Sequence, residues 1–215
     1  MCIFLPRTDL GQATDPPVPT PRRPGESGVT RTLVAGFLFE VGLGLLALAL
    51  GSWAGQPPFA TLSWDGSTFL AGVFATAPML AGFFAVWRSP HRLAAGLRER
   101  IDEIIATMFR RASVVEVGLI ALAAGIAEEA LFRGFLQGLF ESHLGPPAGL
   151  LAASFLFGLA HPLTRGYVVV ATVLGYYLGW LWRITGNLLA PITAHTLYDF
   201  SVLLILIRDQ RSDIA

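Results

Sequence analysis

The sequence contains no lysine, and its 215 residues include a single cysteine, Cys2. One cysteine excludes an intramolecular disulfide and a cysteine-rich metal site. Without lysine, the chain cannot carry a serine–lysine catalytic dyad. Its basic residues are all arginines and equal the acidic residues at 15 each, so no basic surface for nucleic acid is indicated.

Charged residues of any kind are scarce. They make up 14% of this sequence, whereas soluble domains carry about 25%. Hydrophobic residues reach 53% and the mean hydropathy is +0.60. Apolar runs of about 20 residues recur, and this length is enough to cross a bilayer as a helix. We therefore predict an all-α, polytopic integral membrane protein.

The order of apolar runs predicts about six transmembrane helices and one interfacial helix. Six arginines lie between Arg88 and Arg111, among apolar residues spaced three and four apart, a pattern typical of an amphipathic helix at the membrane surface. Asn187 is a plausible N-cap of the last span, whose first turns tolerate Pro191. The predicted spans are residues 33–53, 69–87, 114–140, 148–160, 167–182 and 188–207.

The chain divides into a membrane domain, predicted at residues 31–208, and two tails. Residues 1–30 hold six of the 14 prolines and show no helical periodicity, so we expect a disordered tail. They also lack the pattern of a signal peptide. The C-terminal tail is predicted at 209–215, and the core that carries the chemistry at about 113–208.

The distribution of arginines predicts the orientation of the chain. They cluster before the first span, between the second and third spans, at Arg165, and at Arg208 and Arg211, whereas the opposite loops hold only Arg183. The positive-inside rule then places both termini in the cytoplasm.

Three charged residues interrupt the third span. A charge at the centre of a bilayer costs about 2.5 to 3.5 kcal/mol on insertion scales, so each one needs a reason. Glu129 and Arg133 are four residues apart, in the order that favours an ion pair on one helix face. Glu128 is rotated by about 100° from Glu129 on a helix and has no such partner.

Two histidines and an aspartate fall in later apolar segments. His161 ends the fourth, and His195 and Asp199 share a helix face in the sixth. If these groups converge with Glu128, they form a polar chamber within the lipid, with a base and hydrogen-bond donors suited to amide hydrolysis. The isolated or interfacial residues Glu40, His91, Glu116 and His143 are assigned no chemistry.

Other intramembrane protease types do not fit these residues. The match to the rhomboid motif Gly-x-Ser-Gly, at residues 25–28, lies in the predicted tail. Tyr198 and Asp199 lack the Gly-x-Gly-Asp motif that accompanies this pair in aspartyl intramembrane proteases. The zinc motif His-Glu-x-x-His is absent from the sequence.

The remaining pattern is Glu128-Glu129-x-x-x-Arg133, then Phe157-x-x-x-His161, then His195-x-x-x-Asp199. It resembles the CPBP intramembrane proteases, a family that includes the Ras-converting CAAX endoprotease and bacterial Abi-type proteins, and the resemblance covers residues 115–202. The family implies that Glu128 and His161 activate the attacking water and that His195 and Asp199 form the oxyanion hole. Glu129 and Arg133 would hold the site in shape.

The role of a metal and the state of Asp199 stay open. Some family members have been described as metalloproteases, and zinc could be held by Glu128, His161 and His195. We slightly favour a metal-free mechanism. The family commonly has Asn where this chain has Asp199. Asp199 would either orient and charge His195 as an ionised group or, as we weakly favour, donate a hydrogen bond itself when protonated.

The resulting hypothesis is an intramembrane endopeptidase acting on a membrane-associated protein or peptide in the lipid bilayer. Prenylated CAAX tails are a substrate class implied only by the family. The first alternative is a non-catalytic membrane scaffold or immunity protein of the same fold. The second is a proton-coupled transporter, against which the absence of matched, Gly/Pro-interrupted spans argues.

Overall fold

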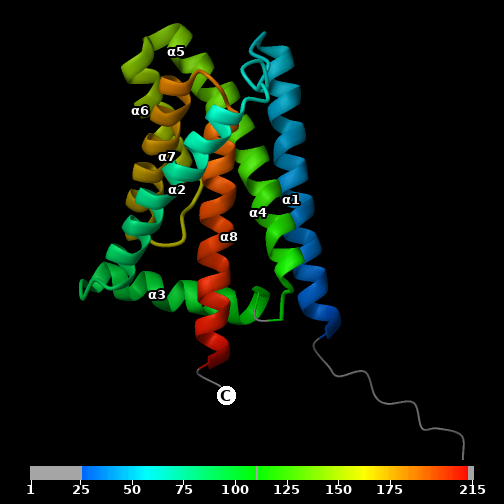
Figure 1. The fold of residues 1–215 in the computed structure, drawn as a ribbon, viewed down its shortest axis with the longest axis vertical. Coiled ribbons are helices and arrows are strands. Elements are labelled where there is room, and N and C mark those ends of the chain that lie inside the picture. Colours follow the sequence, from blue (N-terminus) through cyan, green and yellow to red (C-terminus); the bar gives the residue numbers. More distant parts are fainter. Residues whose placement is uncertain (1–25, 110, 213–215) are drawn as a thin grey trace, which may run out of the picture.

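The computed structural model describes residues 26–109 and 111–212, which are helical except for the connecting loops and contain no strand. The predicted all-α membrane fold is confirmed. The elements shown in Figure 1 are α1 (Glu26–Trp53), α2 (Gly66–Trp87), α3 (Arg92–Ile104), the π-helical turn η1 (Ile105–Phe109), α4 (Val114–Glu129), the π-helical segment η2 (Ala130–Gln137), α5 (Gly138–Leu144), α6 (Pro146–Leu159), α7 (Arg165–Thr185) and α8 (Leu189–Ser212).

Each predicted span coincides with a helix, but the spans differ in length. Among the described residues, α1, α2, α7 and α8 are long and apolar enough to cross a membrane. The predicted third span is divided into α4, η2 and α5, and α6 has only 14 residues. Helix α1 begins at Glu26 and α8 ends at Ser212, so both extend into the predicted tails. Residues 1–25 and 213–215 of those tails lie outside the described part of the chain.

Helices α4 and α8 pack side by side in the centre of the bundle (Figure 1). Helix α1 packs on α4, α2 packs on α8, and α6 pairs with α7. Close approach of the two central helices depends on Gly125, because a Cβ atom there would collide with the side chain of Thr196. Small residues play this role at many membrane helix interfaces. This contact brings the end of α4, with its two glutamates, against His195 of α8.

Helix α3 lies across one end of the bundle (Figure 1). Its residues Ala94 and Leu97 are buried, whereas most of its charged residues are exposed. Arg98 is half-buried and donates to the carbonyls of Trp87 and Ser89 at the end of α2. The start of α1 and the end of α8 lie at this same end, so both ends of the described chain are on one side of the bundle. The compartment that this side faces stays a prediction.

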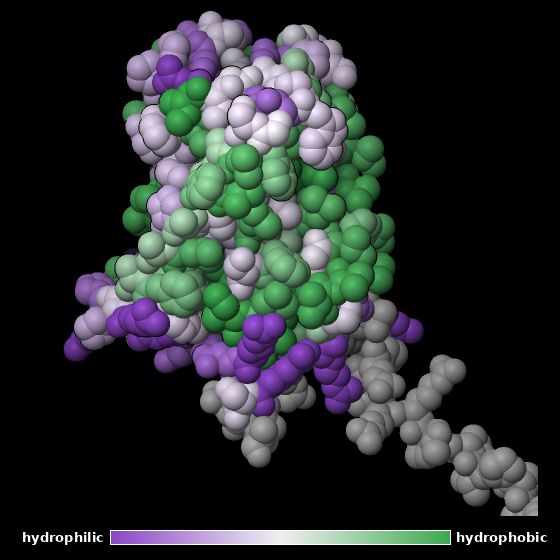
Figure 2. Space-filling model, viewed as in Figure 1, coloured by the Kyte–Doolittle hydropathy of each residue, from purple (hydrophilic) through white to green (hydrophobic). Residues whose placement is uncertain are grey.

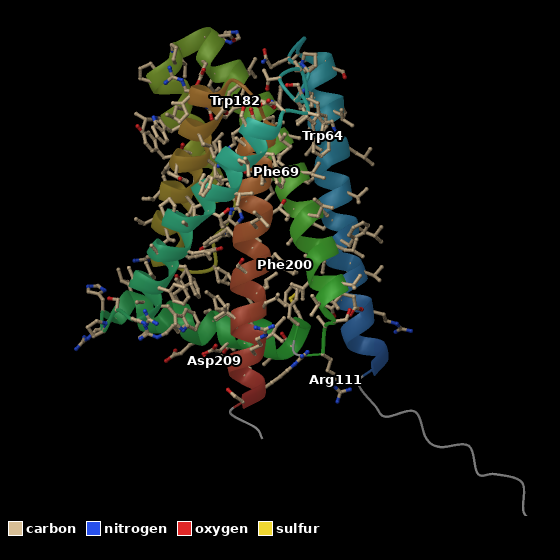
Figure 3. All side chains as sticks on the ribbon, viewed as in Figure 1. Trp64, Phe69, Arg111, Trp182, Phe200 and Asp209 are labelled. Atoms are coloured by element: carbon tan, nitrogen blue, oxygen red, sulfur yellow. The ribbon has the colours of Figure 1, made fainter. Side chains whose placement is uncertain are left out.

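The surface between the two ends is apolar, as a lipid-facing surface must be. Figure 2 shows a broad hydrophobic zone along the bundle and a charged border beside α3. Large side chains such as Phe39, Phe74 and Val115 are exposed within the apolar zone. Trp64 and Trp182 lie towards the end opposite Arg111 and Asp209 (Figure 3), and tryptophans are typical of membrane–water boundaries.

Side-chain caps fix where the helices begin. Asp65 caps α2, and hydrogen bonds from Ser67 and Thr68 lower the pKa of this exposed carboxyl to about 2. The predicted cap at Asn187 is observed, because its Oδ1 accepts from the backbone of Leu189 at 3.0 Å. Its Nδ2 also donates to the carbonyl of Ser63 at 2.8 Å, which ties the start of α8 to the loop between α1 and α2.

Candidate active site

The predicted pair of Glu129 and Arg133 is present and completely enclosed. Arg133 Nη1 donates to Glu129 Oε1 at 2.6 Å, and the two side chains are 2% and 0% exposed. Arg133 Nη2 donates to the carbonyl of Gly175 at 3.0 Å, and its guanidinium lies 4.4 Å from the ring centroid of Phe157. The pair therefore anchors η2 to α7 as well as to α4.

The same carboxylate oxygen also contacts a histidine from another helix. His195 Nδ1 lies 2.7 Å from Glu129 Oε1. This contact is absent from the sequence analysis, because helical spacing relates only residues on the same helix. It means that Glu129, held by Arg133, orients the imidazole of His195 on α8.

The second ring nitrogen of His195 faces Asp199. His195 Nε2 and Asp199 Oδ2 are 3.5 Å apart, which is close enough for electrostatic attraction but long for a hydrogen bond. The predicted proximity of the two residues is observed. Glu129 therefore makes the shorter contact, at Nδ1, and Asp199 faces the opposite nitrogen of the same ring.

Glu128 and His161 form a second pair, separate from the first. Glu128 Oε2 lies 3.5 Å from His161 Nε2 and has no hydrogen-bond partner among the described residues. His161 Nδ1 lies 2.7 Å from the carbonyl of Phe157. A carbonyl only accepts, so Nδ1 carries a proton and Nε2 is the nitrogen presented to Glu128. His161 follows the C-terminus of α6, and this contact one turn back holds its ring.

These residues meet around a cavity of about 70 Å³. The predicted convergence is observed, since Glu128, His161, His195 and Asp199 all line this space. Sequence reasoning missed the tyrosines that share it, Tyr167 of α7 and Tyr198 of α8, because tyrosine in an apolar span gives no signal of its own. The other residues lining the cavity are Met79, Phe157, Ala171, Leu174 and Leu178.

The alternative metal site is not preformed. In residues 26–109 and 111–212, no three His, Cys, Asp or Glu side chains are placed to hold a metal ion. His195 Nδ1 is engaged by Glu129, and its Nε2 faces Asp199. Both imidazoles are held through Nδ1, His195 by Glu129 and His161 by the carbonyl of Phe157, so each presents Nε2 to the cavity that Glu128 also lines.

Removing Arg133 should expose the cost of an unpaired carboxylate. We expect Arg133→Ala to lower the free energy of unfolding by about 3 to 5 kcal/mol, because Glu129 is left charged and buried. The double variant Glu129→Gln, Arg133→Met should recover most of the loss, since Gln still offers an acceptor to His195. Denaturant unfolding in detergent measures both.

The exposed pair of Arg100 and Glu103 provides the control. Its side chains are 60% and 63% exposed, so Arg100→Ala should cost about 1 kcal/mol or less. Equal losses in the single and double variants at 129 and 133 would contradict the coupling of the buried pair.

The part of the chain that carries Glu128, His161, His195 and Asp199 is similar to known proteins. Residues 110–201 match the family model described as type II CAAX prenyl endopeptidase Rce1-like. Over 95 residues the chain is 34% identical to the uncharacterized protein YpbD of Bacillus subtilis (strain 168). That alignment covers 43% of this chain and 46% of YpbD, so it spans less than half of either protein. No solved structure matches the chain. The resemblance predicted from the three motifs is therefore confirmed, and over residues 110–201 the chain is similar to the Rce1-like type II CAAX prenyl endopeptidases.

Proposed function

We propose that this membrane protein is an intramembrane endopeptidase that hydrolyses a peptide bond of a membrane-associated substrate. The observation that carries the proposal is the unpartnered Oε2 of Glu128, which faces His161 inside a polar cavity within the helical bundle. A buried carboxylate without a structural partner is costly in a membrane and marks a functional group. The family match over residues 110–201 supports the same class of reaction.

Glu128 is the proposed general base. A water molecule in the cavity can hydrogen bond to Glu128 and to His161 Nε2, and Glu128 takes its proton as the oxygen attacks the carbonyl carbon. The same proton then passes to the leaving nitrogen as the carbon–nitrogen bond breaks. His161 positions the water, because the contact of Nδ1 with the Phe157 carbonyl fixes the direction of Nε2.

His195 and Asp199 are the proposed oxyanion-binding residues. Preorganised donors aimed at the developing negative charge lower the barrier to amide hydrolysis. Glu129 accepts from Nδ1 of His195 and holds the ring so that Nε2 points towards Asp199 and the cavity. Nε2 donates to the oxyanion when the ring carries both protons, as imidazolium. Arg133 fixes Glu129 in turn, and neither of these two residues needs to touch the substrate.

Replacing Glu128 separates an enzyme from a silent scaffold. Glu128→Gln keeps the side-chain volume but cannot accept a proton from water, so we expect cleavage to fall by at least about 100-fold with folding unchanged. Cleavage is measured with purified protein that is reconstituted into proteoliposomes together with a membrane-anchored peptide library. Glu99→Gln, at an exposed residue of α3, should remain fully active. Full activity of Glu128→Gln would eliminate Glu128 as the base.

A strong zinc chelator should leave activity largely intact. The reason is that the sequence offers three candidate ligands, Glu128, His161 and His195, but no recognised zinc motif. The measurement compares cleavage before and after chelation, with the metal content of the protein determined in parallel. Complete loss of activity that added zinc restores would reverse the preference for a metal-free mechanism.

Asp199→Asn tests how Asp199 acts. The ring of His195 is already held by Glu129, which favours the option in which Asp199 itself donates a hydrogen bond. A carboxyl group donates only while protonated, whereas Asn donates at any pH, so the variant should stay active and extend activity to higher pH. The pH–activity profiles of variant and wild type are compared. An Asn variant that is inactive at every pH would instead show that the charge of Asp199 is required.

A further inference from the structure

Glu40 is a charged residue in the middle of α1, and the reaction proposed above does not use it. It lies within the span of residues 31–53, whose other members from Leu33 onward are almost all apolar or small. The sequence analysis assigned it no chemistry. A carboxylate at this depth opposes membrane insertion, so its presence needs a compensating role.

No structural partner explains Glu40. Its Oε2 atom is buried and has no hydrogen-bond partner among the described residues. Other acids of the bundle are paired: Glu129 with Arg133 and His195, and Glu141 with Gln137. Glu128 and Glu129 also keep one buried oxygen without a hydrogen bond, but Glu128 faces His161 and Glu129 is bound by Arg133 and His195. Of these three glutamates, Glu40 is the one without an ion-pair contact among the described residues.

Both of these glutamates line a second cavity of about 310 Å³. This cavity meets the smaller one at Glu128, Asp199 and two tyrosines, which line both. From there it extends to α3, whose apolar residues Leu97 and Ile101 border its far end. Glu40 therefore stands on the wall of the larger space that opens onto the proposed catalytic groups.

The charges around this space have one dominant sign. Glu40, Glu128 and Asp199 line the larger cavity, and no arginine of residues 26–109 and 111–212 lines it. Among the described residues, the ionisable side chains nearest in effect to Glu40 are the two acids Glu128 and Asp199 and the two histidines His161 and His195. A chamber with apolar walls and carboxylates focuses a field that attracts cations and repels anions.

We propose that Glu40 is a specificity-determining residue that binds a cationic side chain, lysine or arginine, of a substrate whose scissile bond lies at Glu128. The inference rests on the proposed function, because the bound molecule is a substrate only if the protein is an endopeptidase. Apart from the two acids and two tyrosines shared with the smaller cavity, the wall is mostly apolar and suits the hydrophobic residues of a membrane-associated peptide. Glu40 would accept the hydrogen bond for which the protein itself supplies no donor.

Peptide binding to the full chain in detergent micelles tests the proposal independently of cleavage. The probes are fluorescent, N-acylated apolar peptides that carry one lysine at successive positions, each matched by a peptide with norleucine at the same position. We expect wild type to bind at least one lysine peptide about tenfold more tightly than its norleucine partner, a preference of about 1.4 kcal/mol.

Three variants make the test specific. Glu40→Gln should abolish the lysine preference without lowering the melting temperature, since it removes a charge from the membrane and leaves no partner behind. Glu40→Asp should retain part of the preference, and Glu99→Gln all of it. Equal binding of the lysine and norleucine peptides by wild type would overturn the proposal. A lysine preference that persists in Glu40→Gln would also overturn the proposal, whether or not the melting temperature of that variant is lowered.

Cleavage of the same peptides by wild type is scored separately. A lysine preference in binding without any cleavage would contradict the proposed endopeptidase and leave the cation site of Glu40 standing. Cleavage without a lysine preference would contradict only the role of Glu40.

Discussion

The arrangement of the site depends on one carboxylate oxygen, Oε1 of Glu129, which contacts both Arg133 and His195 inside the bundle. Within the membrane no water can replace either contact, so the three groups must stay together or leave a charge exposed to hydrocarbon. Arg133 extends the network to the carbonyl of Gly175. The position of the His195 ring is therefore fixed by the same interaction that makes the charges tolerable.

This constraint divides the two adjacent glutamates into different roles. Glu129, at the end of α4, contacts Arg133 of η2 and His195 of α8 and is completely buried. Both glutamates keep one buried oxygen without a hydrogen bond among the described residues, but Glu128, rotated to another face of α4, meets only the imidazole of His161, at 3.5 Å. One residue holds the site together, and its neighbour is left available for chemistry. The π-helical segment η2 that follows them is almost entirely buried, and such segments often occur at functional sites.

Sequence reasoning was most successful where the cause is local. Apolar run lengths located the helices, the cap at Asn187 was correctly expected, and the spacing of Glu129 and Arg133 predicted their ion pair. Contacts between helices could not be derived in the same way, which is why the bond between Glu129 and His195 was missed. Glu40 was judged isolated because its neighbours in sequence are apolar, yet the packing of α1 on α4 places it at a cavity shared with Glu128. The short fourth segment was expected, but the third span was expected as one continuous run over 114–140, because composition does not reveal a π-helical interruption.

Helix α6 has 14 residues, corresponding to a rise of about 21 Å, whereas the hydrocarbon core is about 30 Å thick. The loop that carries His161 consequently lies part-way along the bundle and not at its end (Figure 1). Its backbone groups cannot all be satisfied by helical hydrogen bonds at that depth, and hydrocarbon offers them no others. The shortfall in length favours local thinning of the bilayer beside α6. Because α6 is shorter than the hydrocarbon core is thick, water can reach the loop of His161 at a depth where a full-length helix would be surrounded by lipid.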